Sequence, residues 1–292
     1  MSRKPTLIVL LVLLLLAVLV LTLLYKNRAA PQADEAGTTD FQLPALSDSS
    51  YDWIGVRIFQ NEAGNQVDLL THWNEGEEFP SLGIGHFIWF PAGVDAPFDE
   101  QFPDMVSFLS RRIPDELQMP AWLQQLESFD APWSSKSQFD GEWSSPELTS
   151  LRVWLNNTRQ YQARFIVSTF AQRWRALELP GEKKRDFNAR LEQLVATPQG
   201  LFALIDYYKF KGLGNNPRER YRGQGWGLVQ VLEFMSEPRL NPEICGDMVK
   251  RFRDAAANRL RLRVKLAPPE RNEARWLDGW LKRLDGYLVN AT

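Results

Sequence analysis

Near its N-terminus the chain contains one long run of apolar residues, and beyond it apolar and polar positions alternate in regular patterns. Residues 7–24 hold only Leu, Ile, Val, Ala and one Thr, and a run of this length can cross the hydrocarbon core of a bilayer as a helix. Arg3 and Lys4 precede the run, as is typical of a membrane-inserted segment. The pattern therefore predicts a transmembrane anchor in residues 1–28.

A cleaved secretory signal is the alternative interpretation of this run. Such signals have a shorter apolar region and a small-residue cleavage site directly behind it. Here "YKNRAAPQA" follows, which favours an uncleaved anchor, although "RAA" and "QADEA" keep cleavage open. A single span of this kind leaves the large C-terminal domain outside the cytoplasm. We therefore expect a single-pass inner-membrane protein whose C-terminal domain lies in the periplasm.

Two regions with different patterns follow the anchor. Residues 29–50 are rich in small, acidic and turn-forming residues, which predicts a flexible linker. In the segment after it, Ile54 and Ile58 are spaced like one face of an amphipathic helix. Ser49 or Ser50 is the expected N-cap of this helix, and Gly64 is its expected end.

The pattern of residues 51–292 predicts one α+β domain. Residues 66–90 indicate a small antiparallel sheet with a polar turn at "NEGEE". From about residue 102 onward the apolar spacing is mainly helical, and no internal repeat of fixed period is present. We therefore expect a mainly helical domain with the small sheet near its N-terminal end.

Composition limits the chemistry of this domain. A hydrophobic content of 44% and an aromatic content of 12% are sufficient for a large buried core. The chain has one cysteine, Cys245, and two histidines, His72 and His86. This inventory excludes an internal disulfide framework and argues against a Cys/His metal site. We expect no metal and no cofactor, and any catalysis has to rest on carboxylates.

Charge argues against nucleic acid as a partner. The formal net charge is −2, and the first 28 residues contribute +4, so the remaining residues carry about −6. Nucleic-acid binding needs a clustered basic face, whereas this sequence has only short mixed runs such as "EKKRD" and "RLRLRVK".

Several carboxylates have positions that suit glycoside hydrolysis. Glu62 lies four residues after Ile58, on the buried face at the last turn of the predicted helix, where burial and the helix dipole disfavour the ionised form. An ordinary solvated Glu at a helix end is the alternative interpretation. Glu75, Glu77 and Glu78 follow in the polar turn, and a pair of carboxylates facing each other across a groove can cleave a glycosidic bond.

The stretch "WNEGEEFPSLGIGH" after this helix resembles the active-site hairpin of phage-type lysozymes, in the lysozyme-like superfamily. The family pattern is a catalytic Glu at the end of the first helix, an aromatic residue, an Asp in a short turn, a Thr, and Gly-Ile-Gly-His. Residues 83–86 match the last element. The resemblance then implies Glu62 as the catalytic acid, and Glu75 in place of Asp and Ser81 in place of Thr as the pair that holds the attacking water. Glu77 is the reserve candidate for the role of Glu75.

The resemblance assigns the remaining residues of this hairpin to support. It implies that His86 braces the hairpin by hydrogen bonds, on the side where substrate binds. Gly83 and Gly85 inside a strand indicate that another backbone or a ligand approaches closely. A nucleophilic pair of Ser81 and His86 is a rival interpretation, but no acid is clearly placed to orient the imidazole.

A second motif, "GQGWGLVQVLEFM", resembles the glycine-aromatic entry to a core helix of the same family, and also the "GLMQV" type of motif of goose-type and transglycosylase relatives. This resemblance implies that Gln224, Trp226 and Gln230 face the groove, with Trp226 stacking on a sugar. Packing of a Gly-rich helix start in the core is the alternative for Trp226 and Gln230. Residues at about 95–199 match neither motif and are expected to form a helical insertion.

Three functions remain open from the sequence. The first is a membrane-anchored glycan hydrolase that cleaves β-1,4 bonds of peptidoglycan by general acid/base catalysis. The second is a catalytically inactive lysozyme-like fold that binds the cell wall or serves as a scaffold, and the acidic domain and the Asp-to-Glu and Thr-to-Ser departures favour it. The third is a hydrolase of chitin-type polymers. In each, the expected partner is peptidoglycan or a related amino-sugar polymer.

Overall fold

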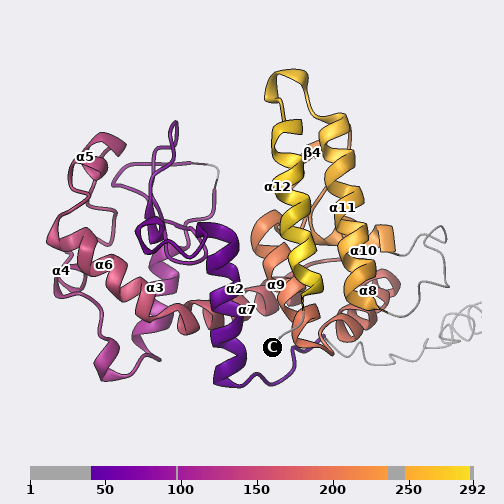
Figure 1. Ribbon diagram of the computed structural model, residues 1–292, viewed down its shortest axis with the longest axis horizontal. Helices are drawn as coiled ribbons and strands as arrows, with labels where there is room; N and C mark the ends of the chain where they lie inside the picture. The colour runs from indigo at the N-terminus through magenta and orange to yellow at the C-terminus, as the bar shows by residue number, and fades with distance from the viewer. Residues whose placement is uncertain (1–40, 97, 236–246, 290–292) are drawn as a thin grey trace, which may run out of the picture. The chain divides into compact units, whose positions relative to one another are not determined.

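The computed structural model describes residues 41–96, 98–235 and 247–289 as a mainly helical fold with a small antiparallel sheet (Figure 1). The predicted anchor, the first part of the predicted linker and Cys245 lie outside these residues. No helix in the described ranges has the combination of length and apolar character needed to cross a membrane. The described residues form one compact unit.

The first described helix, α2 (Asp48–Ala63), has the predicted buried face and the predicted end. Ile54 and Ile58 are buried, and Gly64 ends the helix in the left-handed conformation with a φ of 57°, which glycine adopts without strain. The start differs from the prediction, because the Ser47 side chain, rather than that of Ser49 or Ser50, caps the helix by accepting from the backbone N–H of Ser50.

Residues 41–50, which we expected to belong to a flexible linker, contact the domain. Phe41 is 6% exposed and packs edge-to-face against Phe170, with ring centroids 6.3 Å apart. The α2 helix also begins inside this segment, at Asp48. Burial of one aromatic side chain favours the folded position by about 2 kcal/mol, so the turn-forming composition of the segment did not decide its structure.

The predicted small sheet is present. A 3₁₀ helix, η1 (Val67–Leu70), leads into β1 (Thr71–His72), β2 (Ser81–Leu82) and β3 (Phe87–Ile88), which pair antiparallel in the order β1-β2-β3. Ser81 lies opposite His72 and Ile88 in the register. Residues directly opposite each other share a face of the sheet, so these three side chains project to the same side.

The two glycines of the β2–β3 turn are explained by contacts within the protein. Gly83 has a φ of 72°, and an added Cβ would lie 2.4 Å from the Gln162 side-chain oxygen. At Gly85 an added Cβ would lie 2.7 Å from the Phe87 ring. The close approach that we expected is therefore present. The Gln162 side chain lies against Gly83, and the Phe87 ring of the hairpin lies against Gly85.

The segment at about 95–199 is helical, as predicted. Its helices are α3 (Phe102–Ser110), α4 (Ala121–Gln124), α5 (Lys136–Gly141), α6 (Pro146–Asn157), α7 (Arg159–Ala176) and α8 (Gly181–Leu194), with a 3₁₀ turn η2 (Asp115–Leu117). The longest of them, α7, packs against α2, α3 and α9. The segment therefore contributes to the shared core and does not form a separate module.

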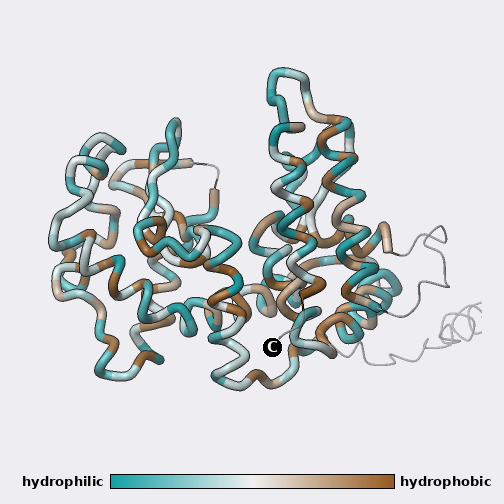
Figure 2. Tube along the Cα trace, viewed as in Figure 1, coloured by the Kyte–Doolittle hydropathy of each residue, from teal (hydrophilic) through white to brown (hydrophobic). Residues whose placement is uncertain are grey.

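The C-terminal part of the fold packs around α9. It comprises α9 (Pro198–Lys211), α10 (Leu228–Met235), α11 (Met248–Leu266), η4 (Pro269–Arg271), α12 (Ala274–Asp285) and η5 (Gly286–Leu288). Nine of the 14 residues of α9, Gly200 to Tyr208, are buried, because α2, α7, α8, α10 and α11 all contact the helix. The connection between α11 and α12 is hydrophilic, whereas apolar positions concentrate lower in the helices (Figure 2).

A second hairpin, which the sequence did not predict, precedes α10. Its strands are β4 (Arg220–Tyr221) and β5 (Gln224–Gly225), joined by a two-residue turn at Arg222 and Gly223. Both turn residues have positive φ, of 50° and 77°, which is the geometry that matches the twist of a tight hairpin. Arginine is uncommon at such a position, so the usual Asn-Gly signal was missing.

Candidate functional site

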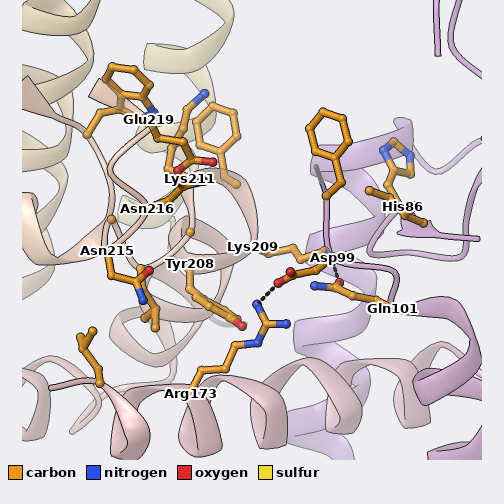
Figure 3. Close-up of a pocket in the computed structure, with 18 of the residues that line it drawn as sticks. His86, Asp99, Gln101, Arg173, Tyr208, Lys209, Lys211, Asn215, Asn216 and Glu219 are labelled. Atoms are coloured by element: carbon orange, nitrogen blue, oxygen red, sulfur yellow. Dashed lines mark hydrogen bonds and ion pairs between the residues drawn. The ribbon is translucent and has the colours of Figure 1, made fainter. Parts of the chain in front are cut away.

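A cavity of about 760 Å³ lies between the β2–β3 turn, the C-terminal end of α9 and the loop that follows it. Figure 3 shows His86, Asp99 and Gln101 on one side and Lys211, Asn216 and Glu219 on the opposite side. Cavities of this size accommodate small organic ligands or a few sugar units.

Glu62 lies beside this cavity, in the last turn of α2. Its side chain is 17% exposed, and its Oε1 accepts a hydrogen bond of 2.5 Å from Arg283 Nη2. Its Oε2 lies 3.6 Å from Nδ1 of His86, which lines the cavity. The predicted partial burial is present. The guanidinium also gives this carboxyl a charge-assisted hydrogen bond that the sequence analysis did not anticipate.

Arg283 belongs to a buried network that fixes Glu62. Asp206 of α9 is fully buried and accepts hydrogen bonds from Nε and Nη2 of Arg283, both at 2.8 Å. It also accepts from the Tyr287 hydroxyl at 2.6 Å and from Asn61 Nδ2 at 3.1 Å. A buried carboxylate with this many donors is fully satisfied, so Arg283 is held rigidly between Asp206 and Glu62.

His86 adopts an unusual backbone conformation at the edge of the cavity. Its φ is 46°, and its N–H donates to the Gly83 carbonyl at 3.2 Å. The Nε2 atom is buried and has no hydrogen-bond partner among the described residues. Burial lowers the pKa of His86, although Glu62 opposes this shift, so the imidazole is neutral at neutral pH. The expected bracing of the hairpin therefore comes from the backbone and not from the ring.

The predicted water-binding pair, Glu75 and Ser81, is placed on different parts of the hairpin. Ser81 is 6% exposed in β2 and shares a face with Ile88, which lines the cavity. Glu75 is exposed in the turn between β1 and β2 and is not among the described residues that line the cavity. Neither residue is among the described residues that line the cavity: Ser81 is buried on the sheet face that it shares with Ile88, and Glu75 lies in solvent.

The reserve acid of the same turn, Glu77, is held by its neighbours. Its Oε2 accepts from Asn74 Nδ2 at 3.0 Å, and its carbonyl accepts from Trp73 Nε1 at 2.8 Å. Asn74 Oδ1 lies 2.9 Å from Nε2 of His72. These bonds fix the shape of the turn and give Glu77 a structural role.

The three residues predicted from the second motif have three different environments. Gln224 is exposed in β5, and its Oε1 accepts from Arg259. Trp226 is 6% exposed and lines the cavity, with the Arg263 guanidinium 4.1 Å from its ring centroid. A cation over one face leaves less of the indole available for stacking on a sugar.

Gln230 is buried and does not face the cavity. Its Oε1 accepts from the Gly227 N–H at 3.0 Å, and its Nε2 donates to the Gly214 carbonyl at 3.0 Å. The two backbones approach so closely that an added Cβ on Gly227 would lie 2.3 Å from Gly214 Cα. The glycine-rich motif therefore serves packing, and the expectation that Gln230 contacts substrate is replaced by a structural role.

Two lysines at the end of α9 were missed by the sequence analysis. Lys209 Nζ donates to Gln101 Oε1 at 2.9 Å, and burial lowers the pKa of Lys209 to about 8, although Glu62 raises it. Lys211 Nζ lies 3.8 Å from the Phe210 ring centroid and 4.1 Å from that of Trp280. Burial lowers the pKa of Lys211 to about 7.

A signal for these residues was present in the sequence. Asp206, Lys209 and Lys211 interrupt an otherwise apolar helix, "GLFALIDYYKFKG", and charged residues in such a helix are rarely buried without a partner or a function. Among the described residues no group of three His, Cys, Asp or Glu side chains comes together as a metal site. Comparison with family models, curated proteins and solved structures gives no match for this chain.

Proposed function

We propose that the protein is a membrane-anchored, periplasmic glycoside hydrolase of the lysozyme type, which cleaves β-1,4 bonds of peptidoglycan. The position of Glu62 carries this proposal. It is a partly buried carboxyl at a helix end, held by Arg283 and close to His86 of the Gly-Ile-Gly-His turn at the cavity edge. In this proposal Glu62 donates a proton to the glycosidic oxygen.

The proton has a defined place on this carboxyl. Arg283 donates to Oε1, so Oε2 is the atom that carries the proton to the leaving group. The resemblance to phage-type lysozymes implies that Glu75 and Ser81 hold the attacking water, although Glu75 is exposed and is not among the described residues that line the cavity. The separation between the two carboxyl groups then decides the outcome, because about 5 Å suits retention and about 6.5–9.5 Å suits inversion.

The test compares two glutamate variants of the full-length chain in detergent. Glu62→Gln keeps the shape and an oxygen that accepts from Arg283, but it has no acidic proton. We expect it to lower the release of reducing ends from purified peptidoglycan by about 10²-fold or more. The matched control is Glu116→Gln, at an exposed position in η2, which should retain wild-type activity. Equal activity of Glu62→Gln and wild type would exclude the proposed acid.

A catalytically inactive wall-binding protein is the second candidate. It is favoured by two observations: the contact with Arg283 supports the ionised form of Glu62, and Glu75 is exposed away from the cavity lining. Sedimentation with cell-wall sacculi separates the candidates. Binding that Glu62→Gln leaves unchanged, without released fragments from the wild type, supports the second candidate and contradicts the first.

A further inference from the structure

Four cationic side chains line the cavity, and two of them have no carboxylate partner. Arg173 pairs with Asp99 at 2.7 Å, and Arg263 pairs with Glu273 at 2.7 Å. Within the described part of the chain, no carboxylate oxygen lies within 4.0 Å of Lys209 or Lys211. No carboxylate therefore pairs directly with either lysine, and the carboxylates that act on their charge, such as Glu62 and Glu273, do so from a longer distance.

The present contacts of the two lysines do not neutralise them. Lys209 donates to the neutral amide of Gln101, and Lys211 rests on the faces of Phe210 and Trp280. Both contacts orient an ammonium group but leave its charge in place. Because burial of an unpaired charge is unfavourable, an anion that enters the cavity would be stabilised there.

The remaining lining indicates what kind of anion fits. The amide side chains of Gln101, Asn215 and Asn216 line the cavity, and amides bond the hydroxyl and acetamido groups of sugars. Asp99 and Glu219 line it too, so a multiply charged phosphate would be repelled more than a singly charged carboxylate. Both lining arginines, which are the better phosphate ligands, are already paired with carboxylates.

We propose that this cavity binds a glycan that carries carboxylate groups and that Lys209 and Lys211 supply the positive charge that selects it. In peptidoglycan the lactyl group of N-acetylmuramic acid, on every second sugar, is a free carboxylate wherever the stem peptide that is amide-linked to it has been removed, whereas chitin has no such group. The inference rests on the proposed function and adds the substrate feature that its site recognises. Lys209 and Lys211 also supply local positive charge at the cavity, although the domain as a whole is acidic and is not attracted to an anionic cell wall.

Charge on the two lysines makes this selectivity depend on pH. Binding of a carboxylate requires protonated lysines, and their pKa values of about 8 and about 7 imply that affinity falls as the pH rises from 6 to 9. His86 is neutral in most of this range because its pKa is lowered. The charged groups that act on the two lysines are Glu62, Glu219, Glu273, Arg173, Arg263 and Arg283.

The experiment uses two sugars that differ in the carboxylate substituent. Titration calorimetry or ligand-observed NMR at pH 6.5 measures the affinity of the full-length chain for N-acetylmuramic acid and for N-acetylglucosamine. We expect the acid to bind at least about 10-fold more tightly. Lys209→Met and Lys211→Met should each reduce this preference to about threefold or less and leave the binding of N-acetylglucosamine unchanged.

Methionine keeps the length and the apolar stem of lysine and removes only the ammonium group, so both variants should fold. The matched control is Lys282→Met, at an exposed position on α12, which should keep the full preference. Equal affinity for the two sugars, or a preference that survives both cavity variants, overturns the proposal. Inorganic phosphate is the third probe, and lysine-dependent binding of phosphate without binding of the acid also overturns it.

Measurements on Glu62→Gln separate this inference from the proposed function. That variant retains both lysines, so it should still prefer the acid at pH 6.5 even though hydrolysis is lost. Because the Glu62 charge raises the pKa of both lysines, the loss of preference with rising pH should begin at a lower pH than in the wild type. A preserved preference together with unchanged hydrolysis contradicts only the role of Glu62. Loss of hydrolysis in Glu62→Gln without any carboxylate preference in either protein contradicts only the carboxylate site.

Discussion

Replacement of Arg283 by methionine should strongly lower the free energy of unfolding, because it leaves a buried carboxylate without its cation. Asp206 is fully buried and receives two hydrogen bonds of 2.8 Å from Arg283. After the substitution only the neutral donors Asn61 and Tyr287 remain. Methionine fills a similar volume, so the change removes the charge and the hydrogen bonds more than the packing.

The expected loss is about 4 kcal/mol. Removal of one partner of a buried ion pair costs roughly 3–5 kcal/mol, since the other charge stays buried and uncompensated. Asp206 accounts for most of this value. Glu62 adds a smaller part, because its side chain is 17% exposed and water replaces some of the lost interaction.

Urea denaturation of the full-length chain in non-ionic detergent measures the change, with tryptophan fluorescence as the signal. The matched control is Lys282→Met, next to Arg283 on the same helix but exposed. Its free energy of unfolding should stay within about 0.5 kcal/mol of the wild type. The double variant Asp206→Asn with Arg283→Met should be more stable than Arg283→Met by about 2 kcal/mol, since no buried charge remains.

Two results would refute this reasoning. One is an Arg283→Met variant whose free energy of unfolding lies within about 1 kcal/mol of that of the Lys282→Met control. The other is a double variant that is less stable than Arg283→Met alone, which would mean that the Asp206 carboxylate is not the source of the loss.

Three further predictions concern stability. Burial raises the pKa of Glu273, but hydrogen bonds from arginines and a tyrosine outweigh it and lower the pKa from 4.5 to about 2. Ionised Glu273 therefore contributes about 3 kcal/mol to the free energy of unfolding above pH 4.5, and this contribution is lost as the pH falls toward 2. When the free energy of unfolding is measured as a function of pH, Glu273→Gln should lack this loss between pH 4.5 and 2. Gly83→Ala should lower the free energy of unfolding in the same urea assay by roughly 2–4 kcal/mol, because the alanine is strained at this φ and its Cβ clashes with Gln162. Gly76→Ala is the control, since Gly76 has a φ of 81° and an added Cβ would have no neighbour within 4 Å, so it should lower the free energy by only about 1 kcal/mol. Equal losses in the two variants would exclude the clash. Gln230→Leu should lower the free energy of unfolding by about 2 kcal/mol, and with it the midpoint of thermal unfolding, because the Gly227 N–H and the Gly214 carbonyl lose their partners. Gln224→Leu, at an exposed position, should leave the midpoint unchanged. A larger loss of stability in Gln224→Leu than in Gln230→Leu would contradict the structural role of Gln230.

Local patterns predicted the elements that carry the site. The spacing of Ile54 and Ile58 predicted the buried face of α2, and Gly64 predicted its end. The small antiparallel sheet was also predicted at the correct place. These features depend on neighbouring residues and on backbone conformations that few residue types adopt. The tight hairpin at Arg222 was missed because arginine gives no turn signal.

The candidate site was predicted less completely. Glu62 lies beside the cavity and Ser81 lies on the face of the sheet that meets it. Spacing alone could not distinguish Gln224 from Gln230, because a backbone contact between Gly214 and Gly227 decides which amide is buried. It also gave no sign that Gln162 of α7 would fill the space beside Gly83.

The sequence by itself determined the buried face of α2, the first small sheet, the helical character of the rest of the domain, the acidic balance and the carboxylate at the end of α2, because these depend on residue types and short spacings. Only the tertiary structure decided what surrounds that carboxylate. Glu62 and Arg283 are 221 positions apart, and Asp206 and Arg283 are 77 apart. The packing of α2, α9 and α12 brings these charges together and leaves Lys209 and Lys211 unpaired at a cavity, and no local pattern contains that information.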